Sequence, residues 1–541
     1  MTNQINQFLI RPIEQISTLS GWRRYLVAFL GGIFATLAMA PYYLLPLLII
    51  GYCGLFLMLT SLGGKGALRP LKRAFLTGWA FGFGYFLTGL YWMGFAFLAR
   101  GEQFIWLLPI AIPAFCAFLG LFFALPSLAY VWFIKKWGNY PSTTPLFSHA
   151  LLFASLLSVF EYARGHILTG LPWNNTGQAL TGWIAGAQTA SIYGVYGLGF
   201  LVLILSLVAV SRINKSMVFG WPLTIAGLVL LYASGFLLMY VTPTALRDDV
   251  QVSIVQPNIR QKDKINPALA SQNFEKLLKL SASSNAGRDH TRPSDYIIWP
   301  ENAVAWIGDQ PHVLNAIKQS IAPETIILGG SLRQQRDESG KNRFFNTLAI
   351  VEDNNSDRQV SHYYDKHHLV PFGEYLPLKG LLRALGLAKI MPVEDGFTAG
   401  SGPQILHFGP APFAPLICYE AIFPGKLYPK GQRPEWLMTV TNDAWFGDGA
   451  GPKQHLDQAR LRSIETGLPM LRSANTGISA VIDANGRVID KIPLYQQGVL
   501  DTFLPPAKAN TIYNLLGDWL YGVMLAASFL YLRIMGKNPQ D

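Results

Sequence analysis

The chain has 541 residues, of which 51% are hydrophobic and only 14% are charged, a composition that excludes an ordinary soluble protein. Its formal net charge is +11. Because the basic residues flank apolar runs, we interpret this charge as a signal of membrane topology and expect no nucleic-acid partner. Long apolar runs dominate residues 25–242 and 517–535, whereas residues 244–512 have the charges and turns of a globular domain.

The apolar runs predict transmembrane helices, since crossing the ~30 Å of hydrocarbon in a bilayer takes about 20 apolar residues. Eight runs approach that length, which argues against buried helices of a large soluble core. They cover residues 25–40, 42–62, 74–98, 104–134, 147–167, 190–211, 217–241 and 517–535. The first run is short and is separated from the second by Pro41, so this pair predicts a tight helical hairpin.

Basic residues gather in every second connection between these runs, a pattern that marks the cytoplasmic side. They are Arg23, Arg24, Lys65, Arg69, Lys72, Arg73, Lys135, Lys136, Arg212, Lys215, Arg533 and Lys537. We therefore expect both termini in the cytoplasm and residues 244–512 outside it. The sequence from Ala38 to Ala40 has the A-x-A form of a signal-peptide cleavage site, but a second apolar run follows at once, which indicates an uncleaved first helix.

The chain thus divides into a membrane domain of seven helices (1–243), an external domain (244–512) and a C-terminal transmembrane helix (513–541). The external part alternates strand-like and helical segments, which is typical of a layered α/β domain. We predict strands at 250–257, 296–301, 324–332, 344–352 and 436–446, helices at 266–281 and 455–466, and a hairpin at 478–493 that turns at Asn485-Gly486.

Several common catalytic motifs are missing from the sequence. There is no G-x-S-x-G, no H-E-x-x-H and no glycine-rich phosphate loop that ends in Lys-Ser/Thr. The adjacent His367 and His368 would point to opposite faces of an extended chain, which is unsuited to binding one metal. These absences disfavour a serine hydrolase, a zinc enzyme and a nucleotidase.

The chain has three cysteines, and only Cys418 lies outside the predicted spans. Cys53 and Cys116 lie in predicted spans, and Cys418 is alone in the external domain, where no disulfide partner exists. A solitary thiol in an oxidising compartment is either deeply buried or used in chemistry. The residues around Cys418 do not decide between an inert core cysteine and a nucleophile.

Two further residues have the chemistry that a nucleophilic thiol needs. Glu301 ends the strand-like run YIIWPE, and Lys366 lies in HYYDKHHLVPFGEYLP. A partly desolvated carboxylate can take a proton from a thiol, and an ammonium can stabilise both a thiolate and an oxyanion. Singly, Glu301 could be a strand-end salt bridge and Lys366 a solvated loop charge. Together with Cys418 they form a coherent acyl-transfer site.

Four segments resemble the nitrilase superfamily: PE at 300–301, DKHHLVPFGEYLP at 365–377, LICYEAIFP at 416–424 and TNDAWFG at 441–447. The eight apolar runs, LTGLPWN at 168–174 and the long stretch at 441–483 are similar to the apolipoprotein N-acyltransferase family. One position departs from that family, which often has Trp where this chain has Ile265.

The resemblance implies a polytopic α-helical membrane protein with eight transmembrane helices and an extracytoplasmic, nitrilase-like α-β-β-α sandwich. It implies a bacterial inner-membrane enzyme that moves the sn-1 acyl chain of a phospholipid to the α-amino group of a diacylglyceryl apolipoprotein by a ping-pong route. The partners would be those two substrates and the bilayer. No metal or diffusible cofactor is required.

The same resemblance assigns the site residues. It implies that Cys418 is the nucleophile, Glu301 the general base and Lys366 the stabiliser of the tetrahedral intermediate. The supporting or substrate-binding residues would be Glu374, Tyr419, Glu420, Trp173, Trp445 and Asn346. Of these, Trp173 lies in the external loop after the fifth span and matches a position tied to the lipid-facing entrance.

Residues 376–392 are apolar with interspersed basic residues, which indicates either an amphipathic element in the bilayer interface or a helix packed on the domain.

Two other classes of protein could account for part of these sequence features. A membrane-tethered amidase or nitrilase would act on a soluble C–N substrate, although a tether needs one span. A transporter would need polar or broken helices at the membrane midplane, and apart from Glu161 the spans have little of that.

Overall fold

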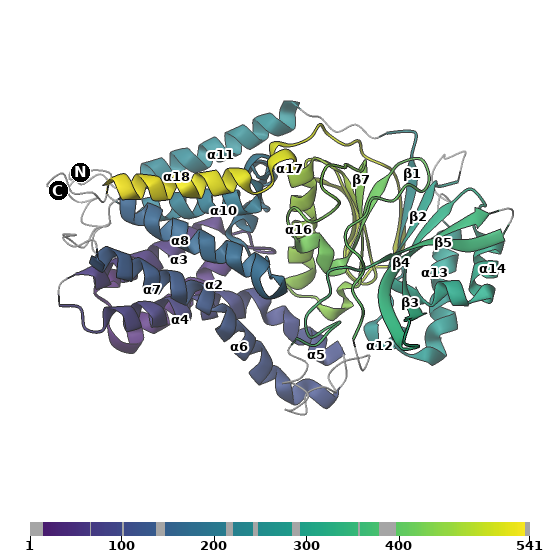
Figure 1. Ribbon diagram of the computed structural model, residues 1–541, viewed down its shortest axis with the longest axis horizontal. Helices are drawn as coiled ribbons and strands as arrows, with labels where there is room; N and C mark the ends of the chain where they lie inside the picture. Colours follow the sequence, from purple (N-terminus) through teal and green to yellow (C-terminus); the bar gives the residue numbers. More distant parts are fainter. Residues whose placement is uncertain are drawn as a thin grey trace. The chain divides into compact units, whose positions relative to one another are not determined.

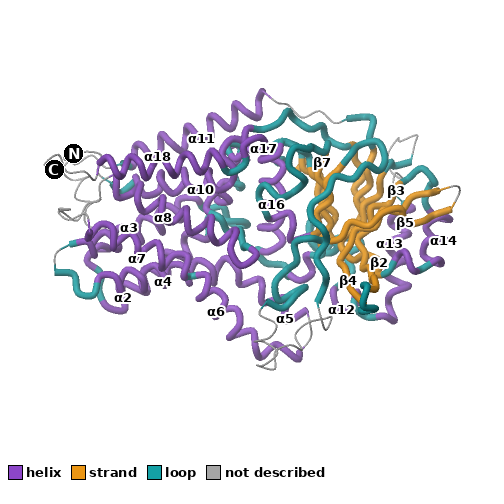
Figure 2. The backbone as a smooth tube through the Cα atoms, viewed as in Figure 1, coloured by secondary structure: helices purple, strands orange, loops and turns teal. Residues whose placement is uncertain are grey.

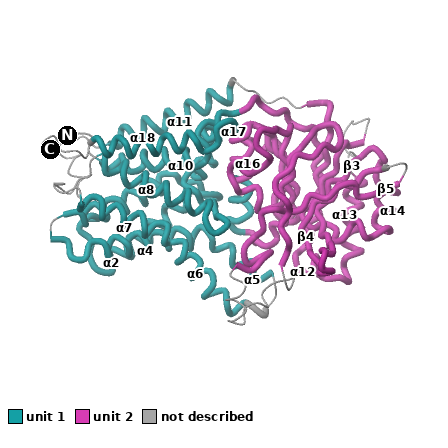
Figure 3. The backbone as a smooth tube through the Cα atoms, viewed as in Figure 1, with its two compact units in different colours: residues 1–242, 449–457, 511–541 teal, residues 243–448, 458–510 magenta. Residues whose placement is uncertain are grey.

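The computed structural model describes residues 15–64, 66–99, 102–136, 147–211, 220–241, 247–283, 293–354, 357–377 and 396–535. The predicted interfacial segment at 376–392 lies almost wholly outside these ranges. The chain forms two compact units (Figure 3). Unit 1 comprises residues 1–242, 449–457 and 511–541, and unit 2 comprises residues 243–448 and 458–510.

Unit 1 is built of helices (Figure 2). They are α2 (Gly21–Thr36), α3 (Leu45–Thr60), α4 (Pro70–Leu90), α5 (Phe95–Ala99), α6 (Leu108–Leu119), α7 (Leu121–Lys136), α8 (Phe147–His166), α9 (Ile184–Ala187), α10 (Ala190–Val208), α11 (Trp221–Val241), α17 (Ile512–Leu516) and α18 (Trp519–Met535). Every predicted apolar run is helical, which confirms the reading of those runs as helices. The predicted end of the first run, at residue 40, is wrong, because α2 ends at Thr36.

Six apolar segments of the described chain are long enough to cross a membrane. They are Leu45–Gly63, Pro70–Ala99, Ile105–Lys136, Phe147–Thr169, Ala190–Val208 and Trp221–Tyr240. Trp519–Ile534 is apolar but shorter. Close helix packing depends on glycine: a Cβ on Gly32 of α2 would lie 2.0 Å from the carbonyl oxygen of Phe81 in α4. Small residues of this kind let two helix backbones approach each other.

Unit 2 contains two β-sheets (Figure 1). The strands are β1 (Gln251–Gln256), β2 (Tyr296–Ala305), β3 (Ile326–Arg336), β4 (Asn342–Asn354), β5 (Asp357–Asp365), β6 (Phe413–Ile417), β7 (Trp436–Thr441), β8 (Met470–Ala474), β9 (Ser479–Ile482), β10 (Val488–Ile492) and β11 (Gly498–Phe503). The six-stranded sheet has the order β11-β1-β2-β3-β4-β5, and the five-stranded sheet has the order β10-β9-β8-β7-β6.

Each sheet contains three neighbouring parallel strands, β1-β2-β3 within one and β6-β7-β8 at one end of the other, and antiparallel strands complete both. The central strands are buried along their length, as expected for parallel strands that are covered on both faces. The predicted hairpin at 478–493 is confirmed as β9 and β10. Strands β5, β8 and β11 were not predicted.

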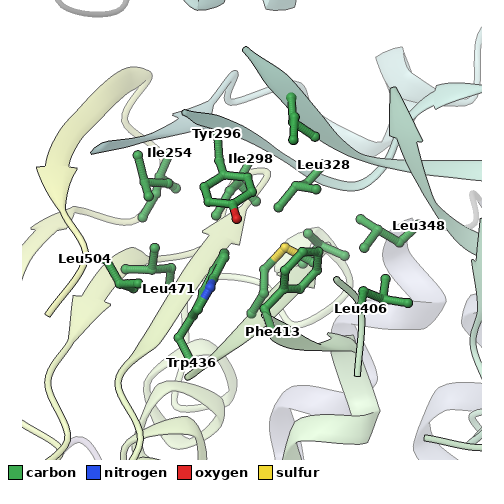
Figure 4. Close-up of a cluster of buried hydrophobic side chains, with 14 of the residues drawn as sticks. Ile254, Tyr296, Ile298, Leu328, Leu348, Leu406, Phe413, Trp436, Leu471 and Leu504 are labelled. Atoms are coloured by element: carbon green, nitrogen blue, oxygen red, sulfur yellow. The ribbon is translucent and has the colours of Figure 1, made fainter. Parts of the chain in front are cut away.

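The main core of unit 2 lies between the two sheets. Figure 4 shows side chains from both sheets meeting there, with Tyr296 of β2 against Phe413 and Trp436 of β6 and β7. The Tyr296 and Trp436 ring centroids are 5.6 Å apart. A second cluster packs helices α13 (Ala270–Ala282) and α14 (Pro311–Ser320) on the outer face of the six-stranded sheet. This arrangement confirms a layered α/β sandwich.

Candidate active site

The thiol of Cys418 sits on a strained turn at the end of strand β6. That strand ends at Ile417, and Cys418 begins the short 3₁₀ helix Cys418–Ile422. The φ angle of Cys418 is 53°, in the left-handed region that costs energy for any residue with a Cβ. Strain of this kind persists only where the surroundings enforce it and is concentrated at functional sites. The side chain is buried, with an exposed fraction of 7%.

Glu301 lies inside strand β2, so the expectation that it ends the strand is wrong. The pairing of β2 with β3 is irregular between Trp299 and Val304, and Asn302 has a φ of 50°. Gly330 of β3 permits this irregularity, because a Cβ there would lie 2.6 Å from the Cα of Glu301. The local break in the ladder frees Glu301 for interactions outside the sheet.

The Glu301 carboxylate is held by donors on both oxygens. Its Oε1 accepts a hydrogen bond from the side-chain amide of Asn346 at 2.8 Å, and its Oε2 accepts one from the backbone N–H of Asn442 at 2.8 Å. Lys366 Nζ lies 3.6 Å from Oε1. An ionised carboxylate only accepts hydrogen bonds, so these partners match the charged form.

Lys366 follows strand β5 and is 1% exposed, which excludes the reading of it as a solvated loop charge. Its Nζ donates to Glu374 Oε1 at 2.8 Å, and the other Glu374 oxygen accepts the backbone N–H of Val370 at 2.8 Å. Asn346 donates to Glu374 as well as to Glu301, so it joins the two glutamates. Burial lowers the pKa of Lys366, but the carboxylates of Glu374 and Glu301 outweigh burial and raise it overall.

The Cys418 thiol lies within the electrostatic reach of both charged groups. Burial raises its pKa, the Glu301 carboxylate raises it further, and Lys366 opposes them without reversing the result. The resting side chain is therefore a neutral thiol at physiological pH. Because the thiolate is the nucleophilic form, attack by Cys418 requires a base to take its proton. The carboxylate of Glu301, whose charge acts on this thiol, is a group able to accept that proton.

Glu420 fastens the turn of Cys418 to the segment that carries Lys366. Its Oε1 accepts the backbone N–H groups of His367 and His368 at 2.8 and 3.2 Å. Its Oε2 accepts the N–H of Ile417 at 2.8 Å and the hydroxyl of Tyr364 at 3.0 Å. Burial alone would raise the pKa of Glu420, but hydrogen bonding and charge from His367 outweigh it and lower the pKa.

Two of the predicted supporting aromatic residues lie in unit 2. The Tyr419 ring packs edge-on against His368 and Phe423, with centroids 5.7 and 5.1 Å away. Trp445 is half-buried in the 3₁₀ helix Asp443–Trp445, three residues after the Asn442 N–H that binds Glu301.

Trp173 belongs to unit 1, whereas Glu301, Lys366 and Cys418 belong to unit 2. It is 2% exposed, and its indole N–H donates to Gln454 Oε1 at 2.7 Å. The indole N–H of Trp92 donates to the same oxygen at 3.1 Å. The loop that carries Trp173 is held by Arg164, which donates to the carbonyl oxygens of Leu171 and Trp173.

Sequence reasoning missed several residues that build the site. Lys264 donates to the backbone carbonyl of Glu301 at 2.7 Å, and Gln261 accepts from the side chain of Asn442 at 2.8 Å. Asp443 forms a buried ion pair with Arg472 at 2.7 Å. Their signal was the position of QPNIRQKDKI and TNDAWFG directly after buried strands, where active sites of α/β proteins gather. Among the described residues, no group of three or more His, Cys, Asp or Glu side chains could hold a metal ion.

The two-sheet fold of unit 2 and a match to a family model place this part of the chain in the class of carbon-nitrogen hydrolases. The family model described as "Carbon-nitrogen hydrolase" matches residues 251–512, and the one described as "Apolipoprotein N-acyltransferase N-terminal domain" matches residues 31–208. A solved CN-hydrolase superfamily protein from Xanthomonas campestris is similar to 55% of this chain and 99% of its own, with 20% identity and a TM-score of 0.33.

Proteins that are similar to this chain over nearly its whole length identify the family within this class. The protein named apolipoprotein N-acyltransferase of Rhodopseudomonas palustris is 38% identical over 535 residues, which is 96% of each chain. The protein of that name from Bradyrhizobium diazoefficiens is 38% identical over 96% of this chain and 97% of its own, and that from Brucella melitensis is 34% identical over the same shares. The chain belongs to the apolipoprotein N-acyltransferase family.

Proposed function

We propose that this protein is an apolipoprotein N-acyltransferase that works through an acyl-enzyme on Cys418. It takes the sn-1 acyl chain of a membrane phospholipid and passes it to the α-amino group of a diacylglyceryl-modified N-terminal cysteine. The observation that carries this proposal is the buried cluster of Glu301, Lys366 and Cys418 in a chain that also has long apolar helices. The relatives named above support the same reaction.

In the first half-reaction, the Cys418 sulfur attacks the ester carbonyl while Glu301 takes the thiol proton. The new C–S bond forms and the carbonyl oxygen becomes negative, close to the ammonium of Lys366. The C–O bond to glycerol then breaks, and Glu301 returns the proton to the leaving oxygen. The products are lysophospholipid and a thioester. The neutral resting thiol supports Glu301 as the base, because a thiol of raised pKa does not ionise unaided.

In the second half-reaction, the free α-amino group of the acceptor attacks the thioester. Glu301 takes a proton from the nitrogen, the C–N bond forms and the C–S bond breaks. The departing thiolate recovers the proton, which restores the resting enzyme. The amine must be unprotonated to attack, so transfer should slow at acid pH as this group, with a reference pKa of about 7.7–8.0, becomes charged.

Glu374 and Asn346 are proposed to keep Lys366 and Glu301 in place. The 2.8 Å hydrogen bond from Lys366 to Glu374 orients the ammonium and favours its charge. The shared amide of Asn346 fixes the separation of the two carboxylates. Tyr419, Trp445 and Trp173 are proposed as substrate-binding residues. The reaction as written requires no metal or diffusible cofactor.

We further propose eight transmembrane helices in the bacterial inner membrane, with both termini cytoplasmic. In this proposal residues 1–243 form the membrane domain, 244–512 the periplasmic catalytic domain and 513–541 the last span. The alternation of basic loops supports the orientation, and the apolar helices α3, α4, α8, α10 and α11 support the spans. Both substrates would then reach the site from the outer leaflet.

A two-substrate assay tests the proposal. Purified protein is incubated with phospholipid labelled in its sn-1 chain, first alone and then with a synthetic diacylated lipopeptide. We expect lysophospholipid and a labelled Cys418 peptide in the first incubation, and a triacylated lipopeptide in the second. Neutral hydroxylamine should release the label from the enzyme, because it cleaves thioesters.

The initial rates should follow ping-pong kinetics. Transfer without any trapped acyl-enzyme, together with intersecting initial-rate lines, would contradict the route through Cys418. Cleavage of a soluble amide without acyl transfer to the lipopeptide would instead identify a membrane-tethered amidase. Cys418→Ala serves as the control and should give no labelled enzyme.

A further inference from the structure

A second lysine lies beside the proposed base, on an element that the triad does not include. Helix α12 (Gln261–Lys264) follows strand β1 and ends at Lys264. The Nζ of Lys264 donates a 2.7 Å hydrogen bond to the backbone carbonyl oxygen of Glu301. Lys264 is only partly exposed, whereas Lys262 on the same helix is exposed.

Helix α12 contacts the main chain of Glu301 directly and is linked to its carboxylate through Asn442. Gln261 and Lys264 are three residues apart, a spacing that brings two side chains to the same face of a helix. Lys264 holds the carbonyl of Glu301 directly. Gln261 Oε1 accepts from the Asn442 side chain at 2.8 Å, and the Asn442 backbone N–H donates to the Glu301 carboxylate. One short helix therefore supports the main chain and the side chain of the base.

The held carbonyl belongs to the irregular part of β2. The β2–β3 register shifts between Trp299 and Val304, and Asn302 adopts a left-handed backbone conformation. A strand segment outside the regular ladder lacks the support of neighbouring strand hydrogen bonds. The hydrogen bond from Lys264 supplies such support at the residue whose carboxylate must face the thiol.

The charge of Lys264 also bears on the thiol. Burial lowers the pKa of Lys264 to about 8, while negative charge on Glu301 and on Cys418 favours its protonated form. Lys264 and Lys366 lie beside Glu301 and Glu374, and Arg472 pairs with Asp443, a further carboxylate that raises the pKa of Cys418. Proton transfer from Cys418 to Glu301 leaves the net charge of the site unchanged, whereas loss of the Lys264 charge makes that net charge more negative, which opposes a thiolate.

We propose that Lys264 is a positioning residue for the acyl-transfer reaction. It holds the backbone of Glu301 in place and supplies, after Lys366, a second positive charge that favours the Cys418 thiolate. This inference rests on the proposed function for its meaning in acyl transfer. Its physical content, an effect of Lys264 on the reactivity of Cys418, holds without any acyl donor.

The test compares three substitutions of Lys264 in the full-length enzyme in detergent or lipid nanodiscs. Lys264→Met removes donor and charge, Lys264→Gln keeps a neutral donor, and Lys264→Arg keeps both. Lys262→Met is the matched control on the same helix. The readouts are the rate of acyl-enzyme formation from phospholipid and the rate of Cys418 alkylation by iodoacetamide, each followed by mass of the Cys418 peptide from about pH 6 to about pH 9.

We expect Lys264→Met and Lys264→Gln to slow acylation at least ~10-fold, as for loss of an electrostatic contact in an active site. Both should shift the alkylation profile of Cys418 to higher pH. Lys264→Arg should restore most of both rates, and Lys262→Met should match the wild-type protein. Wild-type alkylation and acylation profiles in Lys264→Gln would overturn the proposal, as would an arginine variant no better than glutamine.

The two readouts separate this inference from the proposed function. If the protein transfers no acyl chain but Lys264→Gln still shifts the alkylation profile, the proposed function fails and the role of Lys264 stands. If acyl transfer occurs and neither profile responds to Lys264, the proposed function stands and the inference fails. A thermal unfolding midpoint measured for each variant identifies any that fail to fold, and Lys264→Gln then decides in place of Lys264→Met.

Discussion

The carboxylate of Glu420 accepts the backbone N–H of His367 at 2.8 Å, so the second residue after Cys418 is bound to the first residue after Lys366. The same carboxylate accepts N–H or O–H donors from Ile417, His368 and Tyr364, and its Oε1 lies 2.6 Å from the Nδ1 of the His367 ring. Since it is 1% exposed, none of these donors can be replaced by water without rearrangement. Glu420 thereby sets the distance between two parts of the site that are far apart in sequence.

Glu420→Gln should reduce acyl-enzyme formation at least ~10-fold and lower the free energy of unfolding by about 1–3 kcal/mol, because an amide –NH₂ would face buried donors. Acylation rate and thermal midpoint measure the two effects. Glu338→Gln, at an exposed position in the β3–β4 hairpin, is the control and should change neither. A normal thermal midpoint with normal acylation in Glu420→Gln would contradict this role.

The stability contribution of Glu420 should depend on pH. Its pKa in the folded protein lies below the ordinary value of a glutamate side chain, because hydrogen bonding and charge from His367 outweigh burial. A depressed pKa contributes stability that is complete above the unfolded value and is lost as pH falls through the folded value. The difference in thermal midpoint between wild type and Glu420→Gln should therefore be full at neutral pH and shrink below about pH 4.5. A difference that grows on acidification would contradict this sign.

Glu301→Gln should slow one reaction of Cys418 and make another easier. Acyl-enzyme formation should fall at least ~10²-fold, because the thiol proton has no acceptor. Alkylation by iodoacetamide should instead occur at lower pH, because the Glu301 carboxylate raises the pKa of the thiol and its loss favours the reactive thiolate. Peptide mass spectrometry of Cys418 measures both. Unchanged acylation would mean that another group is the base.

Lys366→Met should reduce acylation at least ~10²-fold by removing the charge beside the developing oxyanion. It should also lower the thermal midpoint, since Glu301 and Glu374 would remain buried without their shared cation. Single-turnover acylation and thermal unfolding measure these losses. The exposed Lys430→Met is the control. A stable variant that acylates at the wild-type rate would contradict the assignment.

Gln454→Leu should destabilise unit 1, because it removes the acceptor shared by the indole N–H groups of Trp92 and Trp173. An unsatisfied buried donor costs about 1–3 kcal/mol. Gln454→Glu keeps the acceptor and should cost less, although it loses the donor to the Ala40 carbonyl. Thermal unfolding in one detergent compares the variants, and an equal loss in both would show that the acceptor is not what matters.

Reporter fusions test the topology. Fusions after Pro70, Trp137 and Asp541 should score cytoplasmic, and fusions within 260–500 should score periplasmic, because basic loops mark the cytoplasmic face. A periplasmic score after Asp541 would mean that α18, which is shorter than the six segments long enough to span a membrane, does not cross the bilayer.

The sequence predicted elements where the periodic pattern was local. Runs such as VQVSIVQ and WLMTVT formed strands β1 and β7, and every long apolar run formed helix. Strand β5 was missed because DRQVSHYYD mixes charged and apolar residues, which suits its place at the edge of the six-stranded sheet. Strand β11 was missed because its register depends on pairing with β1, more than 240 positions earlier in the chain.

The candidate site was predictable only as far as its motifs reached. The motifs around Glu301, Lys366 and Cys418 could be read from the sequence, but the irregular backbone that turns Glu301 out of its ladder depends on Gly330 in the neighbouring strand. The contact of Lys264 with Glu301 joins residues 37 positions apart. Such contacts arise from tertiary packing, so a local sequence pattern does not predict them.

Helix α16 (Gly451–Thr466) has a consequence for chimeric proteins. Its beginning, within 449–457, groups with unit 1, and its remainder groups with unit 2. Gln454 and Asp457 in that first part bind side chains of unit 1, from Trp92, Trp173, Tyr43 and Thr181. Suppose that residues 244–512 are replaced by the matching segment of a relative. The new segment would bring its own residues at the beginning of α16, and these would have to bind unit 1 side chains of a different protein. A functional graft therefore has to transfer residues 449–457 together with the unit 1 loops that bind them.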